Sequence, residues 1–346
     1  LAQERSRPCG SHVRVMARDM SQGLSPKALA TIRKRSFASG VEGFARNDPT
    51  FAVTIEAWDR DPFLLGTPDG TVDLRTGKMR AADPADGITK LTSTAPSAQA
   101  DCPLWLRFLQ DATGGDGEMI RFLQQWCGYC LTGDTREHAL VFVHGDGGNG
   151  KSVFLNTTSY ILHDYATTAS MDTFVASRSD RHPTDLAMLR GARLVSASET
   201  EEGRAWAESR IKQMTGGDAI SARFMRQDFF TFQPQFKLFV VGNHQPALHS
   251  VDAAARRRFN IVPFTRKPTK PDRELEAKLR GEAPAHPEAL RRFDDRVRGG
   301  HALEGAVAPI VRLFEALLEQ AEREKTDLAA GAPRAAIELP VDHDPH

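Results

Sequence analysis

Residues 145–152 read GDGGNGKS, and this stretch decides the fold because it fits the phosphate-binding loop pattern GxxxxGK[ST]. Residues 139–144 (ALVFVH) come directly before it and form a short apolar run typical of a buried strand. Residues 153–165 follow with apolar side chains at helical spacing. Because strand, glycine-rich loop and helix stand in this order, the sequence predicts that the chain binds a nucleoside triphosphate.

The residues of the loop have separate roles in this prediction. Glycines allow backbone N–H groups to close around phosphate oxygens, and the N-terminus of the following helix adds positive potential. We expect Lys151 to reach the β- and γ-phosphates and the Ser152 hydroxyl to ligate Mg²⁺. The candidate nucleotide-binding residues are Gly145, Asp146, Gly147, Gly148, Asn149, Gly150, Lys151 and Ser152.

The composition is that of a globular protein, with no sign of a membrane span or a secretion signal. The chain has 346 residues, enough for two domains, and 40% of them are hydrophobic. It has no apolar run of about 18 residues and no apolar core of a signal peptide near its start. Its four cysteines do not form a secreted disulfide framework, so we expect a cytoplasmic protein of a prokaryotic or phage-infected cell. The 45 basic and 45 acidic residues balance, which neither favours nor excludes nucleic acid.

The region before the loop predicts a small mixed domain. Residues 63–80 contain short β-like runs with turn signals at Asp69-Gly70 and Thr76-Gly77. Two helices follow, the first capped by Asp101 and the second starting at Asp116. The second helix carries WCGYC at 126–130, in which core packing of the two cysteines is favoured and thiol redox chemistry is the alternative.

Beyond the loop, polar residues stand at the ends of predicted core strands. Residues 193–198 predict a second strand that leads to Glu199, a candidate for holding Mg²⁺ and positioning water, although a solvated acidic turn is the alternative. Residues 236–241 predict a third strand that ends at Gly242-Asn243, where an ATPase would place a sensor of the γ-phosphate. Arginines 256–258 precede a fourth strand, and one of them is a candidate arginine finger for a neighbouring subunit.

A predicted β-hairpin carries the candidate nucleic-acid contacts. Residues 220–225 are expected to pair with residues 229–232 across a turn at 226–228. Its arginines suit DNA phosphates, whereas its phenylalanines are expected to pack in the core rather than to stack on bases.

Together these stretches resemble the superfamily 3 helicases, in particular the C-terminal helicase region of phage and plasmid primases and their poxvirus-type primase-helicase relatives. The stretches that carry the resemblance are GDGGNGKS, HPTDLAMLRGARLVSASETEEG, TGGDAISARFMRQDFF, FKLFVVGNH and RRFNIVPF, in family order. The resemblance covers about residues 63–284 and implies a P-loop NTPase of AAA+-like α/β fold. It also implies a ring, with a hexamer as the expected size. This ring would hydrolyse ATP with Mg²⁺ and move on single-stranded DNA during replication. A primase or another replication protein is the further partner that it implies.

The resemblance also implies roles for single residues. Lys151 and Ser152 match the Walker A positions, Glu199 the Walker B acid and Asn243 the sensor. The arginine finger matches Arg257 or Arg258. The DNA-binding positions implied on or beside the hairpin are Arg223, Arg226, Phe229 and Lys237.

We divide the chain into four parts on this basis. Residues 1–50 are expected to be a poorly patterned, partly disordered segment, 51–135 a small mixed α/β and helical domain, 136–266 the ATPase core and 267–346 a C-terminal segment that departs from the family after about 284. The first 50 residues are too few for a primase domain. Two alternatives stay open, a degenerate DNA- or partner-binding protein and a small-molecule kinase that uses the same loop.

Overall fold

The computed structural model describes residues 15–16, 19, 23–49, 55–96, 102–175, 184–199, 206–243 and 257–283. The chain divides into two compact units, Leu1–Trp58 and Asp59–His346. The first unit contains α2 (Pro26–Ile32), α3 (Arg35–Asn47) and the short 3-10 helix η2 (Ile55–Ala57). Helix α2 begins at a proline, and the Ser25 side chain accepts a hydrogen bond from the Ala28 N–H at 3.4 Å. This is the usual local signal that starts a helix.

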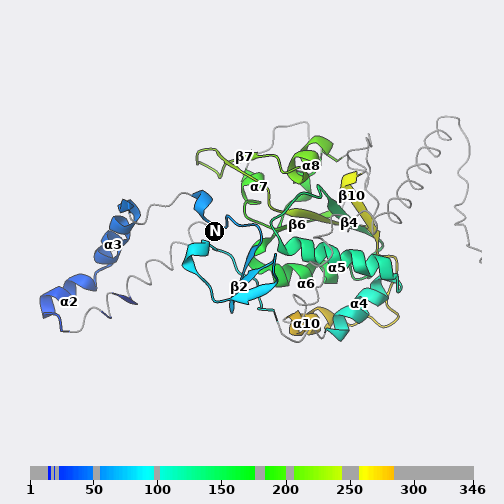
Figure 1. Ribbon diagram of the computed structural model, residues 1–346, viewed down its shortest axis with the longest axis horizontal. Coiled ribbons are helices and arrows are strands. Elements are labelled where there is room, and N and C mark those ends of the chain that lie inside the picture. The colour runs from blue at the N-terminus through cyan, green and yellow to red at the C-terminus, as the bar shows by residue number, and fades with distance from the viewer. Residues whose placement is uncertain are drawn as a thin grey trace, which may run out of the picture. The chain divides into compact units, whose positions relative to one another are not determined.

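A five-stranded parallel sheet forms the centre of the second unit (Figure 1). Its strands are β4 (Leu140–His144), β5 (Ala166–Thr168), β6 (Leu194–Glu199), β9 (Lys237–Gly242) and β10 (Phe259–Pro263). Their order across the sheet is β10-β4-β9-β6-β5, and every neighbouring pair is parallel. The four core strands predicted from the sequence are therefore confirmed, and β5 is an edge strand that the sequence reading missed.

Along each central strand, side chains contribute alternately to two separate hydrophobic cores. In β4, Val141 and Val143 belong to one cluster, whereas Leu140 and Phe142 belong to the other. Strand β9 alternates in the same way. Because successive strand residues point to opposite faces, both faces of the sheet are buried, as expected for a parallel sheet with cover on each side.

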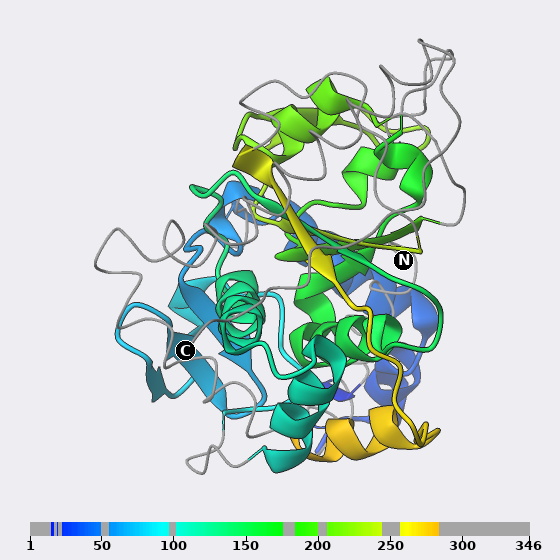
Figure 2. The same ribbon diagram turned by 90° about the vertical axis from the view of Figure 1, so that its right-hand side faces the viewer.

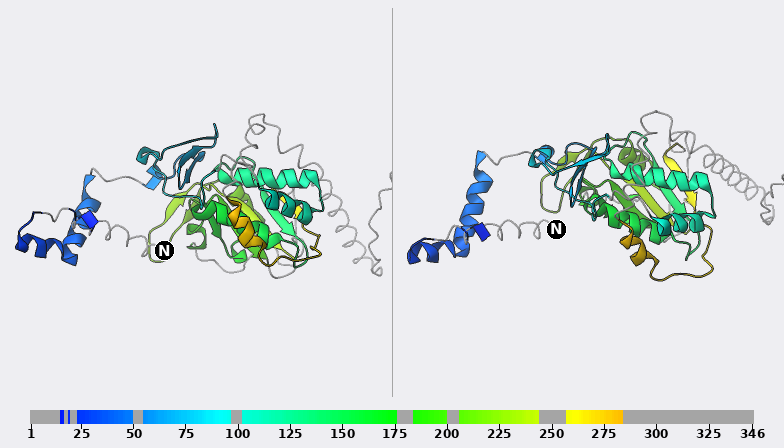
Figure 3. Two further views of the ribbon diagram at one scale, coloured as in Figure 1. Left: turned by 90° about the horizontal axis from the view of Figure 1, so that it is seen from below. Right: turned by 60° about the horizontal axis from the view of Figure 1, so that its bottom comes forward.

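Four helices and a small antiparallel sheet contribute to the first core (Figures 2 and 3). The helices are α4 (Pro103–Thr113), α5 (Gly117–Leu131), α6 (Lys151–Leu162) and α10 (Leu275–Gly281). The small sheet has the order β1 (Leu64–Thr67), β2 (Gly70–Asp73) and β3 (Lys78–Arg80). The sequence predicted a strand pair in this region, and the structure has three strands that meet near the two predicted turns. The predicted boundary at residue 135 therefore falls inside a shared hydrophobic core.

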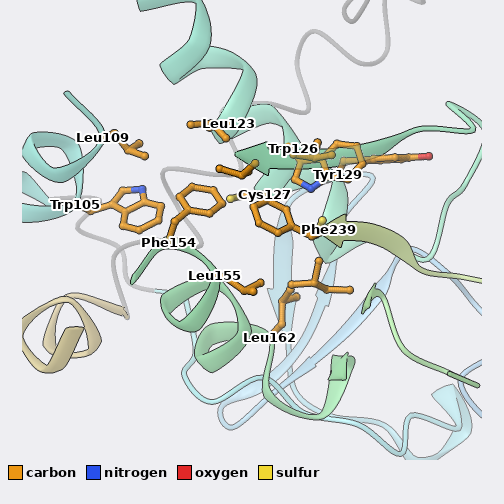
Figure 4. Packing of buried hydrophobic residues seen from close by; sticks show 14 of the residues in the cluster. Trp105, Leu109, Leu123, Trp126, Cys127, Tyr129, Phe154, Leu155, Leu162 and Phe239 are labelled. Atoms are coloured by element: carbon orange, nitrogen blue, oxygen red, sulfur yellow. The ribbon is translucent and has the colours of Figure 1, made fainter. Parts of the chain in front are cut away.

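Aromatic rings stack through the centre of this first core (Figure 4). The Phe154 ring lies 5.4 Å from that of Trp105 on one side and 5.5 Å from that of Phe239 on the other, centroid to centroid. These rings come from α6, α4 and β9, so the helix that follows the phosphate loop is anchored to both the sheet and the helical layer. Such pairs add about 0.5–1.5 kcal/mol each beyond their burial.

The second core is covered by shorter elements. They are α7 (Thr184–Ala187), α8 (Glu208–Thr215) and the hairpin of β7 (Ile220–Ala222) with β8 (Phe230–Phe232), which pair in antiparallel register. The remaining 3-10 helices of this unit are η3 (Pro84–Asp86), η4 (His163–Tyr165) and η5 (Met171–Thr173). Among the described residues, no helix is long and apolar enough to cross a bilayer.

The start of α4 differs from the sequence prediction. The residue at the N-cap position is Cys102, which makes no side-chain capping bond, and the predicted cap Asp101 lies outside the described residues. Instead, the backbone N–H groups of Leu104 and Trp105 each donate to the Glu282 carboxylate at 3.0 Å. A carboxylate from the far end of the unit therefore caps this helix. For α5 the prediction is confirmed, because Asp116 accepts from two N–H groups of the first turn.

The two cysteines of WCGYC are core residues. Cys127 and Cys130 are buried on α5, and burial raises the pKa of both thiols, that of Cys130 to about 12. Thiols held in the protonated form are poor nucleophiles. The prediction that they pack in the core is confirmed, and the redox alternative loses its chemical basis.

Candidate functional site

The loop between β4 and α6 has a backbone that requires glycine at defined places. Gly145, Gly148 and Gly150 have φ angles of 144°, 82° and 90°. A Cβ added to Gly145 would overlap the carbonyl oxygen of Phe264, and one added to Gly150 would lie 2.8 Å from the Phe108 ring. At both positions the φ angle and the lack of space for a Cβ favour glycine. The glycines thus allow a tight approach between the loop, β10 and α4.

Lys151 begins α6 and folds back onto the loop. It is buried, and its Nζ donates to the carbonyl oxygens of Gly145 and Asp146 and to Oδ1 of Asn149, the latter two at 3.0 Å. Burial lowers the pKa of Lys151; the Asp146 carboxylate opposes this shift, and Lys267 adds to it. The same ammonium group lowers the pKa of His144, although burial contributes more. Phosphate oxygens would replace carbonyl acceptors around Lys151.

Three strand ends meet at the carboxyl edge of the sheet, next to this loop. His144 of β4 pairs in register with Gly242 of β9, and Gly242 pairs with Glu199 of β6. Asn243 follows Gly242 and is exposed. The backbone positions of the predicted Walker B acid and sensor therefore lie level with the loop, at the edge where open parallel sheets bind ligands. Ser152 is exposed in the first turn of α6. Glu201 and Glu202 lie outside the described residues.

Arg257 and Arg258 lie at the opposite edge. They directly precede Phe259, which pairs with Leu140 at the start of β4, whereas the loop follows the end of that strand. The length of β4 separates the two edges by about 13 Å at ~3.3 Å per residue. These arginines therefore stand apart from the loop of their own chain. Arg256 lies outside the described residues.

The β7–β8 hairpin is confirmed with shorter strands than predicted, and its connecting loop spans 223–229. Arg226 has a φ of 62° in this loop. The Arg223 guanidinium lies 4.6 Å from the centroid of the Phe229 ring. That ring is 60% exposed and Phe224 is 39% exposed, whereas Phe232 is buried. The expectation that the hairpin rings pack in the core is right for Phe230, which packs against the second core, and wrong for Phe224 and Phe229 of the loop.

Lys237 does not lie where a DNA contact would need it. Its side chain is 2% exposed, and its ammonium group donates to the backbone oxygens of Thr132 and Asp134 and lies 4.6 Å from the centroid of the Tyr129 ring. Burial lowers the pKa of Lys237 to about 7. The prediction that it contacts DNA is contradicted by this burial. The sequence around Lys237 carries no signal that distinguishes a DNA contact from a buried lysine bonded to backbone carbonyl groups.

Two residues that contact the loop were given no role at it in the sequence prediction. Phe264 follows β10, and its carbonyl oxygen accepts from Nδ2 of Asn149. Lys267 forms an ion pair with Asp146, with Nζ 3.6 Å from Oδ2. Both come from far along the chain, so no local pattern links them to the loop. Among the described residues, no group of three or more His, Cys, Asp or Glu side chains forms a ready metal site.

Two family models match this chain. Residues 5–114 match a family described as D5 N terminal like, and residues 143–258 match a family of unknown function (DUF5906). The second match contains the phosphate loop, the strand that ends at Glu199, the hairpin and β9. It therefore covers every strand end described above except that of β10.

The chain is similar to several viral proteins named as helicases. It is 26% identical over 253 residues to "Putative helicase L207/L206" of Acanthamoeba polyphaga mimivirus, covering 70% of this chain and 26% of that protein. It is 26% identical to "Putative helicase 022R" of Frog virus 3, covering 50% and 18%, and 25% identical to "Putative helicase 121R" of Invertebrate iridescent virus 3, covering 60% and 23%. The chain spans about a quarter of the length of these relatives, or less.

Among solved structures, the apo structure of the NrS-1 C terminal region matches with a TM-score of 0.49 and 12% identity. The match covers 64% of this chain and 53% of that one.

Proposed function

We propose that this chain is the ATP-hydrolysing motor module of a D5-type replication helicase, a P-loop NTPase of the AAA+-like superfamily 3 class. The observation that carries the proposal is the meeting of the GDGGNGKS loop with the ends of β6 and β9 at one edge of a parallel sheet. The names of the viral relatives support a helicase, and the match of residues 5–114 to the D5 N terminal like family supports the D5 type. ATP and Mg²⁺ are the proposed ligands.

Hydrolysis in this proposal depends on charges placed around the terminal phosphate. Lys151 would neutralise charge that develops on the β- and γ-phosphates, and Ser152 and Glu199 would hold Mg²⁺. Asn243 lies at the adjoining strand end, where an amide can hydrogen-bond the γ-phosphate or the attacking water. Bound Mg²⁺ would supply electrostatic stabilisation of the transferred phosphoryl group.

The position of Arg257 and Arg258 supports an assembly of several copies. Because they stand at the amino edge of the sheet, away from the loop of their own chain, an arginine finger from this segment would serve a neighbouring copy. A ring, with a hexamer as the proposed size, would bring such edges together. An arginine supplied in this way raises the rate by about 10³–10⁵-fold.

The hairpin loop is the proposed contact with single-stranded DNA. Arg223 and Arg226 supply positive charge, and the exposed Phe229 and Phe224 rings supply faces on which bases can stack. Neither kind of contact selects a base sequence. Binding should therefore weaken as salt is raised and depend little on sequence.

The first test is the ATPase rate with and without single-stranded DNA, with Lys151→Ala as the blank. The proposal expects hydrolysis that DNA stimulates and that the variant lacks. Hydrolysis indifferent to DNA would indicate a kinase-like or uncoupled site. DNA binding without hydrolysis in either protein would indicate a degenerate binding protein.

A second test examines the hairpin loop by fluorescence anisotropy with labelled single-stranded DNA. Phe229→Ala should weaken binding by ~1–3 kcal/mol if one base stacks on the ring. Met79→Ala removes an apolar side chain that is 48% exposed on β3 and is the matched control. Equal effects of the two substitutions would remove the hairpin from the DNA-binding surface. Particle size measured with and without ATP tests the ring.

A further inference from the structure

The segment after β10 is fastened to the phosphate loop by its backbone. The Phe264 N–H donates to the carbonyl oxygen of His144 at 2.7 Å, and the Phe264 carbonyl accepts from the Asn149 side chain. Pro263 pairs in register with His144. Phe264 therefore leaves the sheet directly beside the loop, and Lys267 follows three residues later.

This course brings the side chain of Lys267 to the loop. Its Nζ lies 3.6 Å from Oδ2 of Asp146, and the two side chains are 58% and 85% exposed. An exposed ion pair of this kind contributes ~0–1 kcal/mol. Lys267 can therefore exchange Asp146 for a stronger anion at little cost.

Two ammonium groups converge on Asp146 from opposite parts of the chain. Lys151 Nζ donates to its backbone oxygen at 3.0 Å, and Lys267 Nζ pairs with its carboxylate. Both ammonium groups contact the same residue, and the charge of Lys267 lowers the pKa of Lys151, so a multiply charged anion that contacts both is favoured. Because the lysine of this loop pattern reaches the β- and γ-phosphates, the second cation lies at the same, terminal end of a bound triphosphate.

We propose that Lys267 is a γ-phosphate-binding residue, supplied by the segment after β10, that lets the site distinguish a nucleoside triphosphate from a diphosphate. This inference rests on the proposed function, because it requires that the loop binds a nucleotide. In the diphosphate state Lys267 stays paired with Asp146. In the triphosphate state it transfers to the terminal phosphate, where it makes a charge-assisted hydrogen bond.

The test is equilibrium binding, measured by calorimetry with Mg²⁺, of ADP and of the non-hydrolysable analogue adenylyl imidodiphosphate. Lys267→Ala should weaken binding of the analogue about five- to tenfold, as expected for one exposed charged hydrogen bond, and binding of ADP less than about twofold. Lys267→Arg should keep most of the selectivity. Lys278→Ala is the matched control, because Lys278 is an exposed lysine of α10 that pairs with Asp272 instead.

A double variant separates direct contact from charge neutralisation. If Lys267 only offsets the negative charge of Asp146, Asp146→Asn combined with Lys267→Ala will bind the analogue as tightly as Asp146→Asn alone, and the proposal is overturned. The proposal is also overturned if Lys267→Ala weakens the binding of both nucleotides equally, or weakens the binding of neither. In that case, loss of nucleotide binding in Lys151→Ala would leave the proposed function standing. If the unaltered protein binds neither nucleotide, both fall.

Discussion

Substitution of Gly145 by alanine tests whether the shape of the phosphate loop depends on its contact with β10. A Cβ at this position would overlap the Phe264 carbonyl oxygen and lie 2.5 Å from Nδ2 of Asn149. The φ angle of 144° is also one that L side chains rarely adopt. Gly147 offers a control in the same loop, because a Cβ there meets no atom within 4 Å and its φ is not in that range.

The two penalties at Gly145 give the expected size of the effect. Strained backbone costs ~1–3 kcal/mol, and forcing an extra methyl into a closely packed place costs a further ~1–3 kcal/mol. We expect Gly145→Ala to lower the free energy of unfolding by about 2–6 kcal/mol, a large part of the ~5–15 kcal/mol typical of a domain. Gly147→Ala should be neutral or stabilise by up to ~1 kcal/mol, because alanine restricts the unfolded chain.

The assay is urea unfolding of both variants and the unaltered protein, followed by tryptophan fluorescence, with nucleotide binding measured on the same samples. If the chain relieves the clash by moving Phe264 away, stability will be retained but the loop will open and nucleotide binding will weaken. The reasoning is refuted if Gly145→Ala matches the unaltered protein in both measurements. It is also refuted if the two alanine variants lose stability equally.

Three further results are expected. Burial holds the pKa of Lys237 at about 7, below its usual ~10.4, so between these values the unfolded chain binds more protons and stability rises with pH. Urea titrations at pH 7, 8 and 9 should show a rise of at most ~1.4 kcal/mol per pH unit that Lys237→Met abolishes; a rise that persists in the variant contradicts this. Glu282→Ala removes the acceptor at the start of α4 and should lower the free energy of unfolding by ~0.5–2 kcal/mol in the same assay. Unchanged stability would contradict the capping role of this carboxylate. Cys127 and Cys130 should resist iodoacetamide in the native state and react after unfolding, as measured by mass spectrometry of their peptides; rapid native labelling would show that they are not buried.

Local patterns were sufficient for the elements that build the candidate site. Apolar runs at 139–144 and 236–241 predicted buried strands, and the glycine-rich loop with Lys151 predicted the turn between strand and helix. These signals are strong because a strand buried on both faces needs a continuous apolar run, and because the backbone at positions 145, 148 and 150 of the loop requires glycine. The three-residue strand β5 lacks such a run and was missed.

Contacts between distant parts of the chain set the features that the sequence did not predict. The cap of α4 comes from Glu282, and nothing near position 103 indicates it. Lys237 was assigned to DNA contact by the family resemblance alone, but the carbonyl groups after α5 surround it. For Phe229, the residue pattern favoured core packing and the family resemblance implied a DNA contact, and the short strands of the hairpin leave it exposed in the loop.

The bond between Asn149 and Phe264 joins residues 115 positions apart, and this separation has a consequence for biosynthesis. A ribosome adds about 5–20 residues per second, so roughly 6 to 23 s pass between translation of the loop and translation of the residue that fastens it. Both neighbours of β4 in the sheet, β9 and β10, also emerge late. For most of this interval the apolar β4 segment has no strand to pair with, so the nascent chain is an expected client of chaperones. The proposed nucleotide site is complete only after Phe264 has been made.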